Sequence, residues 1–127
     1  MPSLQIVLPD GRTAYSPGEN LSGEAIWDLE DKPKEVMLQL VWQTQGKGTA
    51  DMDIVETVSF ADPQARESRS FSVQLPEAPY TFSGQLISLI WNLELNVQPR
   101  DQSHALEITI APNGKEIILP RIQPVNK

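Results

Sequence analysis

The chain has 127 residues, of which ten are basic and seventeen are acidic, giving a formal net charge of −7. This length fits one domain with an ordinary hydrophobic core. The sequence contains no cysteine, which excludes disulfides, thiolate metal sites and a cysteine nucleophile, and the acidic balance disfavours binding to phosphate backbones of nucleic acids.

The first expected element is a short strand at residues 4–8, followed by a turn at residues 9–12. The apolar stretch at this end is interrupted and stops at Pro9, without a preceding basic region, so we do not expect a signal peptide. The absence of cysteine mildly favours a reducing compartment, so we expect a cytoplasmic protein. The longest apolar stretch, residues 86–91, is too short to cross a bilayer, which predicts no membrane insertion.

Alternation of apolar and polar residues recurs along the rest of the chain, and no stretch has the period of a helix. The alternating segments are residues 21–29, 35–45, 51–60, 66–75, 85–97 and 104–110. The longest apolar stripe consists of Ile87, Leu89, Trp91, Leu93, Leu95 and Val97. The expected inward face of residues 51–60 consists of Met52, Ile54, Val58 and Phe60, interrupted by Glu56. The pattern predicts an all-β, immunoglobulin-like, two-sheet antiparallel β-sandwich of about seven to eight strands.

Proline and glycine mark the turns between these strands. Residues 16–19 suit a type II turn, because Pro17 fixes φ and Gly18 permits positive φ. Gly23 lies inside the next strand, where a bulge or the close approach of another backbone is the usual reason for glycine. Near the other end, an Asn-Gly pair at residues 113–114 predicts a type I′ hairpin between residues 108–110 and 116–119.

The aromatic residues divide into two groups. Trp27, Trp42 and Trp91 lie in phase with aliphatic residues of their strands, which favours core packing over a stacking platform for sugars or bases. The aromatic side chains expected to be exposed lie in turns and are Tyr15, Tyr80 and Phe82.

No catalytic pattern emerges from the sequence. The single histidine, His104, follows Ser103, and neighbours in a strand point to opposite faces, so the two do not form a base–nucleophile pair. Acidic clusters at residues 28–31 and 51–56 contain oxygen ligands of the kind calcium prefers, but neither has the specific calcium loop. Solvated polar loops are favoured, and calcium binding stays open. We expect no enzyme activity, no cofactor and no metal.

Three motifs together resemble a known family. They are Tyr-x-Pro-Gly-Glu-x-x-x-Gly at residues 15–23, Phe-x-Val-x-Leu-Pro at residues 71–76, and Ser83-Gly84 before a strand that carries Trp91. In this order they resemble the N-terminal domain of the arrestin family, in the single-domain form also seen in sporulation-control proteins and a retromer subunit. The resemblance implies one arrestin-like β-sandwich over residues 1–127, with residues 112–127 forming a strand and tail. The phosphate-sensing basic residues and polar core of arrestins cannot be placed here, so phosphoreceptor binding is not implied.

What the family resemblance implies about function is binding to other proteins. We therefore expect a non-enzymatic protein-interaction or scaffold module, whose partner is an unknown protein or a second copy in a homodimer. An open edge strand can pair with a partner's strand, and the residues expected at such an edge are Ile117, Ile118, Leu119 and Ile122. The alternative is a small-ligand or carbohydrate-binding sandwich that uses the aromatic residues in turns.

Overall fold

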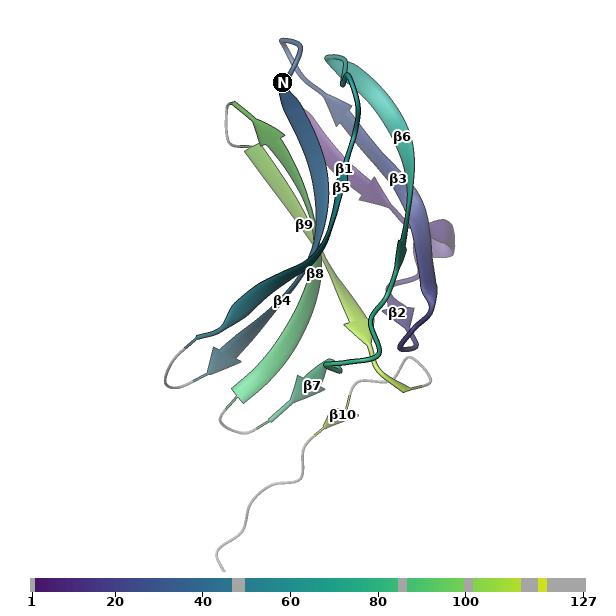
Figure 1. The fold of residues 1–127 in the computed structure, drawn as a ribbon, viewed down its shortest axis with the longest axis vertical. Coiled ribbons are helices and arrows are strands. Elements are labelled where there is room, and N and C mark those ends of the chain that lie inside the picture. The colour runs from purple at the N-terminus through teal and green to yellow at the C-terminus, as the bar shows by residue number, and fades with distance from the viewer. Residues whose placement is uncertain (1, 47–49, 85–86, 100–101, 113–116, 119–127) are drawn as a thin grey trace, which may run out of the picture.

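Two β-sheets face each other in the computed structural model, which describes residues 2–46, 50–84, 87–99, 102–112 and 117–118 (Figure 1). The described strands are β1 (Ser3–Val7), β2 (Ala14–Tyr15), β3 (Asn20–Asp28), β4 (Glu35–Gly46), β5 (Met52–Ser59), β6 (Arg66–Gln74), β7 (Phe82–Ser83), β8 (Ile87–Gln98), β9 (Gln102–Ile110) and β10 (Ile117–Ile118). One 3-10 turn, η1 (Pro9–Gly11), follows β1. The predicted all-β sandwich is confirmed, and its seven longer strands match the expected segments within about two residues.

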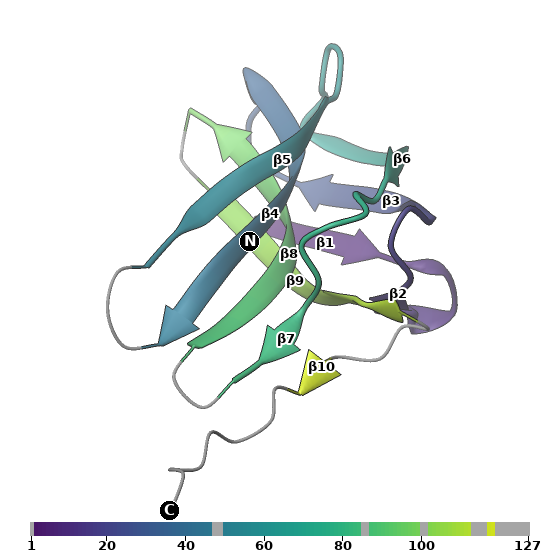
Figure 2. The same cartoon turned by 60° about the horizontal axis from the view of Figure 1, so that its bottom comes forward.

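The small sheet has the strand order β1-β3-β6, and the large sheet has the order β10-β7-β8-β4-β5. Strand β9 pairs with β8 through residues 102–108 and with the short strand β2 through residues 109–110. The longer strands pair antiparallel, whereas β2 with β9 and β10 with β7 are parallel pairs. Strands β4 and β8 pair along their whole length and form the centre of the large sheet. In Figure 1 the lower ends of β4, β5 and β8 sweep away from the small sheet, and Figure 2 shows the same strands from below.

The core lies between the sheets and is built from alternate residues of their strands. Trp27 and Trp91 are 1% and 0% exposed, and both belong to the main core cluster. The Nε1–H of Trp27 donates to the carbonyl of Gln64 at 2.7 Å, and that of Trp91 donates to the carbonyl of Pro79 at 2.9 Å. Trp42 is half-buried and packs against the same cluster. The prediction that the tryptophans belong to the core is confirmed.

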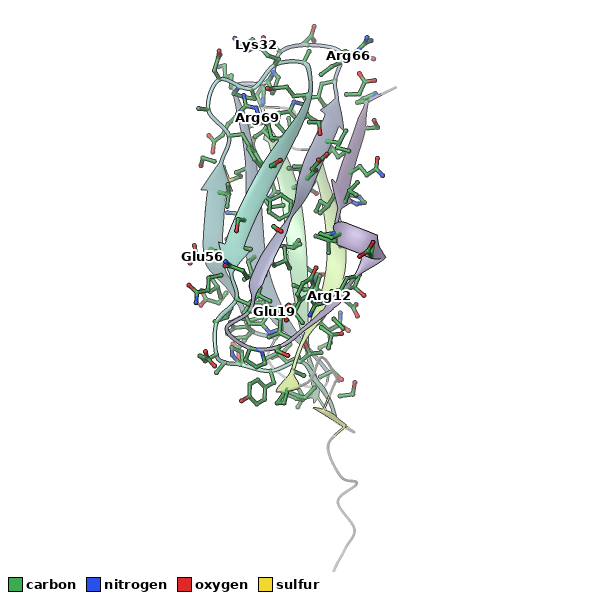
Figure 3. All side chains as sticks on the ribbon, turned by 90° about the vertical axis from the view of Figure 1, so that its right-hand side faces the viewer. Arg12, Glu19, Lys32, Glu56, Arg66 and Arg69 are labelled. Atoms are coloured by element: carbon green, nitrogen blue, oxygen red, sulfur yellow. The ribbon has the colours of Figure 1, made fainter. Side chains whose placement is uncertain are left out.

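The turn that precedes β3 has the predicted geometry. Gly18 has φ of +76°, and the N–H of Glu19 donates to the carbonyl of Ser16 at 3.2 Å. Arg12 closes the turn from outside, because its guanidinium donates to Glu19 at 2.8 Å while its Nη1 lies 2.6 Å from the second Glu19 oxygen (Figure 3). The N–H of Ser16 also donates to Glu19. These hydrogen bonds lower the pKa of the Glu19 carboxyl, and the bond from Arg12 has the largest effect.

The first testable prediction follows from this pKa. A carboxyl whose pKa is lower in the folded chain stabilises that chain above its ordinary pKa of about 4.3, and the effect is lost as pH falls through the folded value. The variant Glu19→Gln is therefore expected to melt below the wild type at neutral pH, and the difference should close in acid. Thermal unfolding measured between pH 7 and pH 2.5 tests this, with Glu107→Gln as the control of equal charge. A difference that stayed constant over the whole range would contradict the assignment.

The inward face predicted for β5 is wrong in its first half. The register between β4 and β5 pairs Leu40 with Glu56 and then Val41 with Ile54, so that Val55 has no partner and forms a bulge. One extra residue puts the residues before it out of phase with those after it, so the side chains that precede Val55 lie on the opposite face from the one their spacing with Val58 predicts. Met52 and Ile54 consequently lie on the outward face, 61% and 46% exposed.

The predicted C-terminal hairpin is also wrong. Strand β10 pairs in parallel with β7, and β9 pairs instead with β2 and β8. The physical reason lies at Ile110, whose N–H donates to the hydroxyl of Thr81 at 2.9 Å and whose carbonyl accepts from the Thr81 N–H at 2.7 Å. Because Thr81 occupies both backbone groups, the end of β9 has no place for a hairpin partner. The expected Asn-Gly turn lies outside the described residues.

Candidate interaction surface on the large sheet

The face of the large sheet that points away from the small sheet, here named the outer face, is formed by β4, β5, β8 and β9. On β4 and β8 the inward residues are buried aliphatic and aromatic core residues, so the intervening residues point outward. The register then gives the outward residues of β5 and β9. Most outward residues are amides, hydroxyls and carboxylates, and they include Gln39, Gln43, Thr57, Ser88, Asn92, Glu94, Asn96 and Glu107. None of the described elements covers this face (Figure 1).

Four neighbouring apolar side chains on the polar outer face form what we name the outer apolar patch: Val41, Met52, Ile54 and Ile90. Met37 also lies on this face, opposite Ser59 and Asn96, but outside the patch. Val41 lies opposite Ile54 in the register, and Gln43 lies opposite both Met52 and Ile90, so the four positions are contiguous across three strands. Val41 is only 2% exposed although it does not belong to the core cluster between the sheets. Its burial on the outside is consistent with cover by its apolar neighbours on β5 and β8.

The long strands of the large sheet also have an unusual charge. The strands β4, β5, β8 and β9 contain no lysine or arginine, whereas they carry the carboxylates Glu35, Asp53, Glu56, Glu94 and Glu107. Among the described residues, ion pairs lie instead on the small sheet and the loops, and they join Arg12 to Glu19, Lys32 to Asp62, Arg66 to Asp28 and Arg69 to Glu67 (Figure 3). The large sheet is therefore negative, without cations of its own strands to compensate.

The free edge of β5, beside this patch, is protected against pairing with another strand. Besides the bulge at Val55, the register places Asp53 opposite the half-buried Trp42 and Glu56 opposite the core residue Leu40, so both carboxylates point inward at the edge. Bulges and inward-pointing charges are the usual devices that prevent strand addition. A partner at this end of the molecule would consequently meet the face of the sheet and not its edge.

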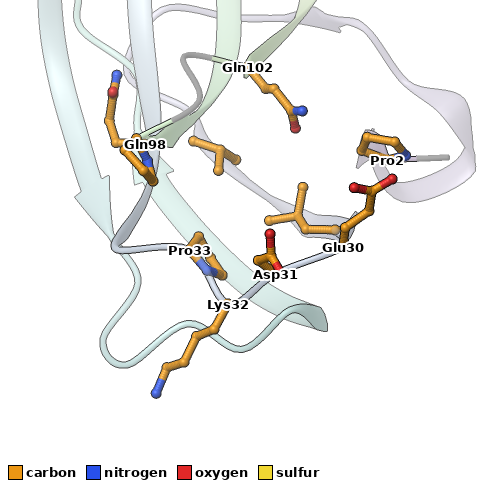
Figure 4. Close-up of a pocket in the computed structure, with 10 residues that line it drawn as sticks. Pro2, Glu30, Asp31, Lys32, Pro33, Gln98 and Gln102 are labelled. Carbon is orange, nitrogen blue, oxygen red and sulfur yellow. The ribbon is translucent and has the colours of Figure 1, made fainter.

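A separate pocket of about 210 Å³ lies at one end of the sandwich, between the β3–β4 loop and the β8–β9 turn (Figure 4). Its wall includes Glu30 and Asp31 of the first predicted acidic cluster and also Lys32, whose side chain points away from the pocket and pairs with Asp62 at 3.0 Å. Asp28 of the same cluster is paired with Arg66. Within the described part of the chain, no group of three acidic or histidine side chains is arranged to hold a metal ion.

The structure separates the aromatic residues that were expected to be exposed together. The prediction that Tyr15 is exposed is wrong, because its side chain is only 3% exposed. Tyr15 belongs to β2, which pairs in parallel with β9, and the guanidinium carbon of Arg12 lies 4.4 Å from the centre of its ring. Phe82 is half-buried against the core, which also departs from the expectation, since β7 pairs it with the core residue Leu89. Tyr80 is 37% exposed and stands without the other two, so these residues do not form an aromatic row.

The predicted partner-binding edge is described only in part. Ile117 and Ile118 form β10, which extends the large sheet beyond β7. Leu119 and Ile122 lie outside the described residues. The expected edge and the outer apolar patch therefore belong to the same sheet but to different strands.

Comparison with known proteins finds no matching family model and no matching curated protein. Among solved structures, the chain is similar to Spo0M, a sporulation control protein from Bacillus subtilis, with 20% identity, a TM-score of 0.62 and coverage of 87% of this chain. The chain spans about half, 49%, of that protein. A weaker likeness, with a TM-score of 0.45 and 15% identity, covers 16% of a β-glucosidase from Listeria innocua. The likeness to Spo0M shows that the fold is an arrestin-like sandwich. No membrane-spanning helix is found in the described ranges.

Proposed function

We propose that this chain is a non-enzymatic protein-interaction module of the arrestin-like type, a single domain that acts in the cytoplasm. The observation that carries this proposal is the outer apolar patch, where Met52 and Ile54 expose 61% and 46% of their surface on an otherwise polar sheet. Contiguous exposed apolar residues with a polar surround are typical of sites where proteins bind one another. The fold supports the same reading, since its resemblance is to a family that binds proteins.

Two other surfaces are weaker candidates than the outer apolar patch for the main binding site. Strand β10 can still add a partner's strand, which keeps Ile117 and Ile118 as a secondary interaction edge. A carbohydrate site would need a row of exposed aromatic rings, and only Tyr80 among the three expected rings is exposed, at 37%. We therefore place the main contact on the sheet face.

The experiment compares capture of cellular proteins by the wild-type chain and by the double variant Met52→Thr/Ile54→Thr. Threonine retains a preference for strands while removing apolar surface, so the fold should persist. The matched control is Val7→Thr, because Val7 is 40% exposed but lies on β1 of the small sheet. We expect a partner, identified by mass spectrometry and then purified, to bind at least about tenfold more weakly to the double variant, since burial of each large side chain contributes about 1.5–3 kcal/mol. Equal binding by all three chains would refute the proposed surface.

A further inference from the structure

We infer that the outer apolar patch binds an amphipathic helix of a partner protein, with lysine and arginine beside the apolar stripe of that helix. This inference rests on the proposed function and specifies the chemistry of the partner. It is carried by the charges beside the patch, by the size of the patch and by the protected edge beside it.

Two outward carboxylates, Glu94 and Glu107, lie beside the patch on the side of β9. Toward β9, Val41 is opposite Asn92, which in turn is opposite Glu107, while Glu94 lies two residues further along β8. Asp53 and Glu56 of the edge strand β5 lie opposite the inward residues Trp42 and Leu40, so they do not face the patch. Complementary charge guides association and selects the partner, so a ligand of this face needs cations beside its apolar residues, toward Glu94 and Glu107.

The chain does not provide these cations from the described parts of its own sheets. Arg66 and Arg69 of β6 are directed to Asp28 and Glu67 at 2.8 and 2.6 Å, and they belong to the small sheet. Glu94 and Glu107 have no ion pair with a described lysine or arginine. Their charges are therefore available for a partner, and the same argument opposes face-to-face pairing of two copies, which would bring like charges together.

The dimensions of the patch suit one face of a helix. Three strands at a spacing of about 4.8 Å and alternate residues at about 7 Å give a patch of about 10 by 7 Å. A helix has a diameter of about 10 Å and presents apolar residues at positions i, i+3, i+4 and i+7 over two turns. Because the β5 edge is protected by its bulge and by Asp53 and Glu56, we favour a helix lying on the face over a strand added at the edge.

The probe is a synthetic 18-residue peptide with a leucine stripe at helical spacing and flanking lysines. Its Kd is measured by fluorescence anisotropy for the wild type, for Met52→Thr/Ile54→Thr and for Glu94→Gln/Glu107→Gln. We expect about tenfold weaker binding to the first variant and about fivefold weaker binding to the second, because each exposed ion pair contributes about 0.2–1 kcal/mol. Asp10→Asn/Glu24→Gln has the same net charge as the second variant but changes residues away from the large sheet, and it should bind as the wild type does.

Two control peptides distinguish binding of an amphipathic helix at the patch from general attraction of a basic peptide to an acidic protein. A scrambled peptide of the same composition and a version with glutamate in place of lysine should both bind much more weakly. Equal binding of the scrambled peptide, equal loss in the Asp10/Glu24 control, or no binding of the helical peptide would overturn the inference. In each of these cases the proposed function still stands if capture of a cellular partner depends on Met52 and Ile54, so the two failures are distinguishable.

Discussion

Replacement of Trp91 by alanine is expected to lower the free energy of unfolding by about 3–5 kcal/mol, as large-to-small changes in a packed core do. Trp91 is 0% exposed, and its neighbours in the register are Trp42 on β4 and Ile108 on β9. The change would leave a cavity at the centre of the large sheet. It would also remove the hydrogen bond from the indole N–H to the carbonyl of Pro79, one of the contacts that hold the segment between β6 and β7.

Trp42 is the matched control for Trp91. It lies directly opposite on β4 and has the same side chain, but it is only half-buried. Trp42→Ala should therefore cost about half as much or less, since the cost scales with the apolar area removed from contact. Urea unfolding followed by circular dichroism gives both values. Trp91→Phe retains most of the ring and should lose about 1–3 kcal/mol, the cost of the unsatisfied carbonyl, which keeps the test valid if the alanine variant does not fold. Equal losses for the two alanine variants would contradict this account.

Gly23→Ala is the second change with a large expected effect, a loss of about 1–3 kcal/mol. A Cβ at this position would lie 2.5 Å from the carbonyl oxygen of Val7, 2.9 Å from Cδ2 of Leu8 and 3.1 Å from Cζ of Phe71. The first contact is with backbone of β1, which cannot move without disturbing its pairing with β3. Alanine would ordinarily stabilise a strand interior by about 0.5–1 kcal/mol relative to glycine, so a net loss identifies the steric clash as the dominant effect.

The double variant Gly23→Ala/Phe71→Leu separates the contribution of Phe71 from that of the other two contacts. Leucine removes the ring atom near the new Cβ but leaves the Val7 carbonyl in place, so the double variant should lose less than the sum of the single variants without full recovery. Ser22→Ala, a change at the exposed neighbour in β3, serves as the control and should alter stability by less than about 0.5 kcal/mol. A stable Gly23→Ala chain would show that β1 moves freely at this point. Thermal or urea unfolding measures all four variants.

The parts of the fold that are local in character are readable from the sequence. The alternation in β3, β4, β6 and β8 predicts their limits and inward faces, because a strand with one buried face needs a period of two. The turn before β3 is predictable from Pro17 and Gly18, since each restricts or permits a particular φ. The absence of lysine and arginine from the large sheet's long strands is likewise visible in the sequence, once the strands are assigned to one sheet.

The candidate surface was not predictable, because it depends on the bulge at Val55. If β5 had no bulge, Met52 and Ile54 would point into the core, as their spacing with Val58 suggests. Register is determined by all contacts along the β4–β5 pair, and no single residue of β5 specifies it. Tyr15 illustrates the same limit, since its burial depends on a parallel pairing with Ile110, a residue far along the chain.

The sequence by itself therefore determined the class of fold, the core tryptophans and the negative charge, because these follow from composition and short-range periodicity. Only the tertiary structure decided which strands share a sheet, where β10 pairs, and which apolar residues lie outside. The physical reason is that pairing partners and register arise from long-range contacts, such as those of Thr81 with Ile110 and of β4 with β5, in which many weak interactions are satisfied together.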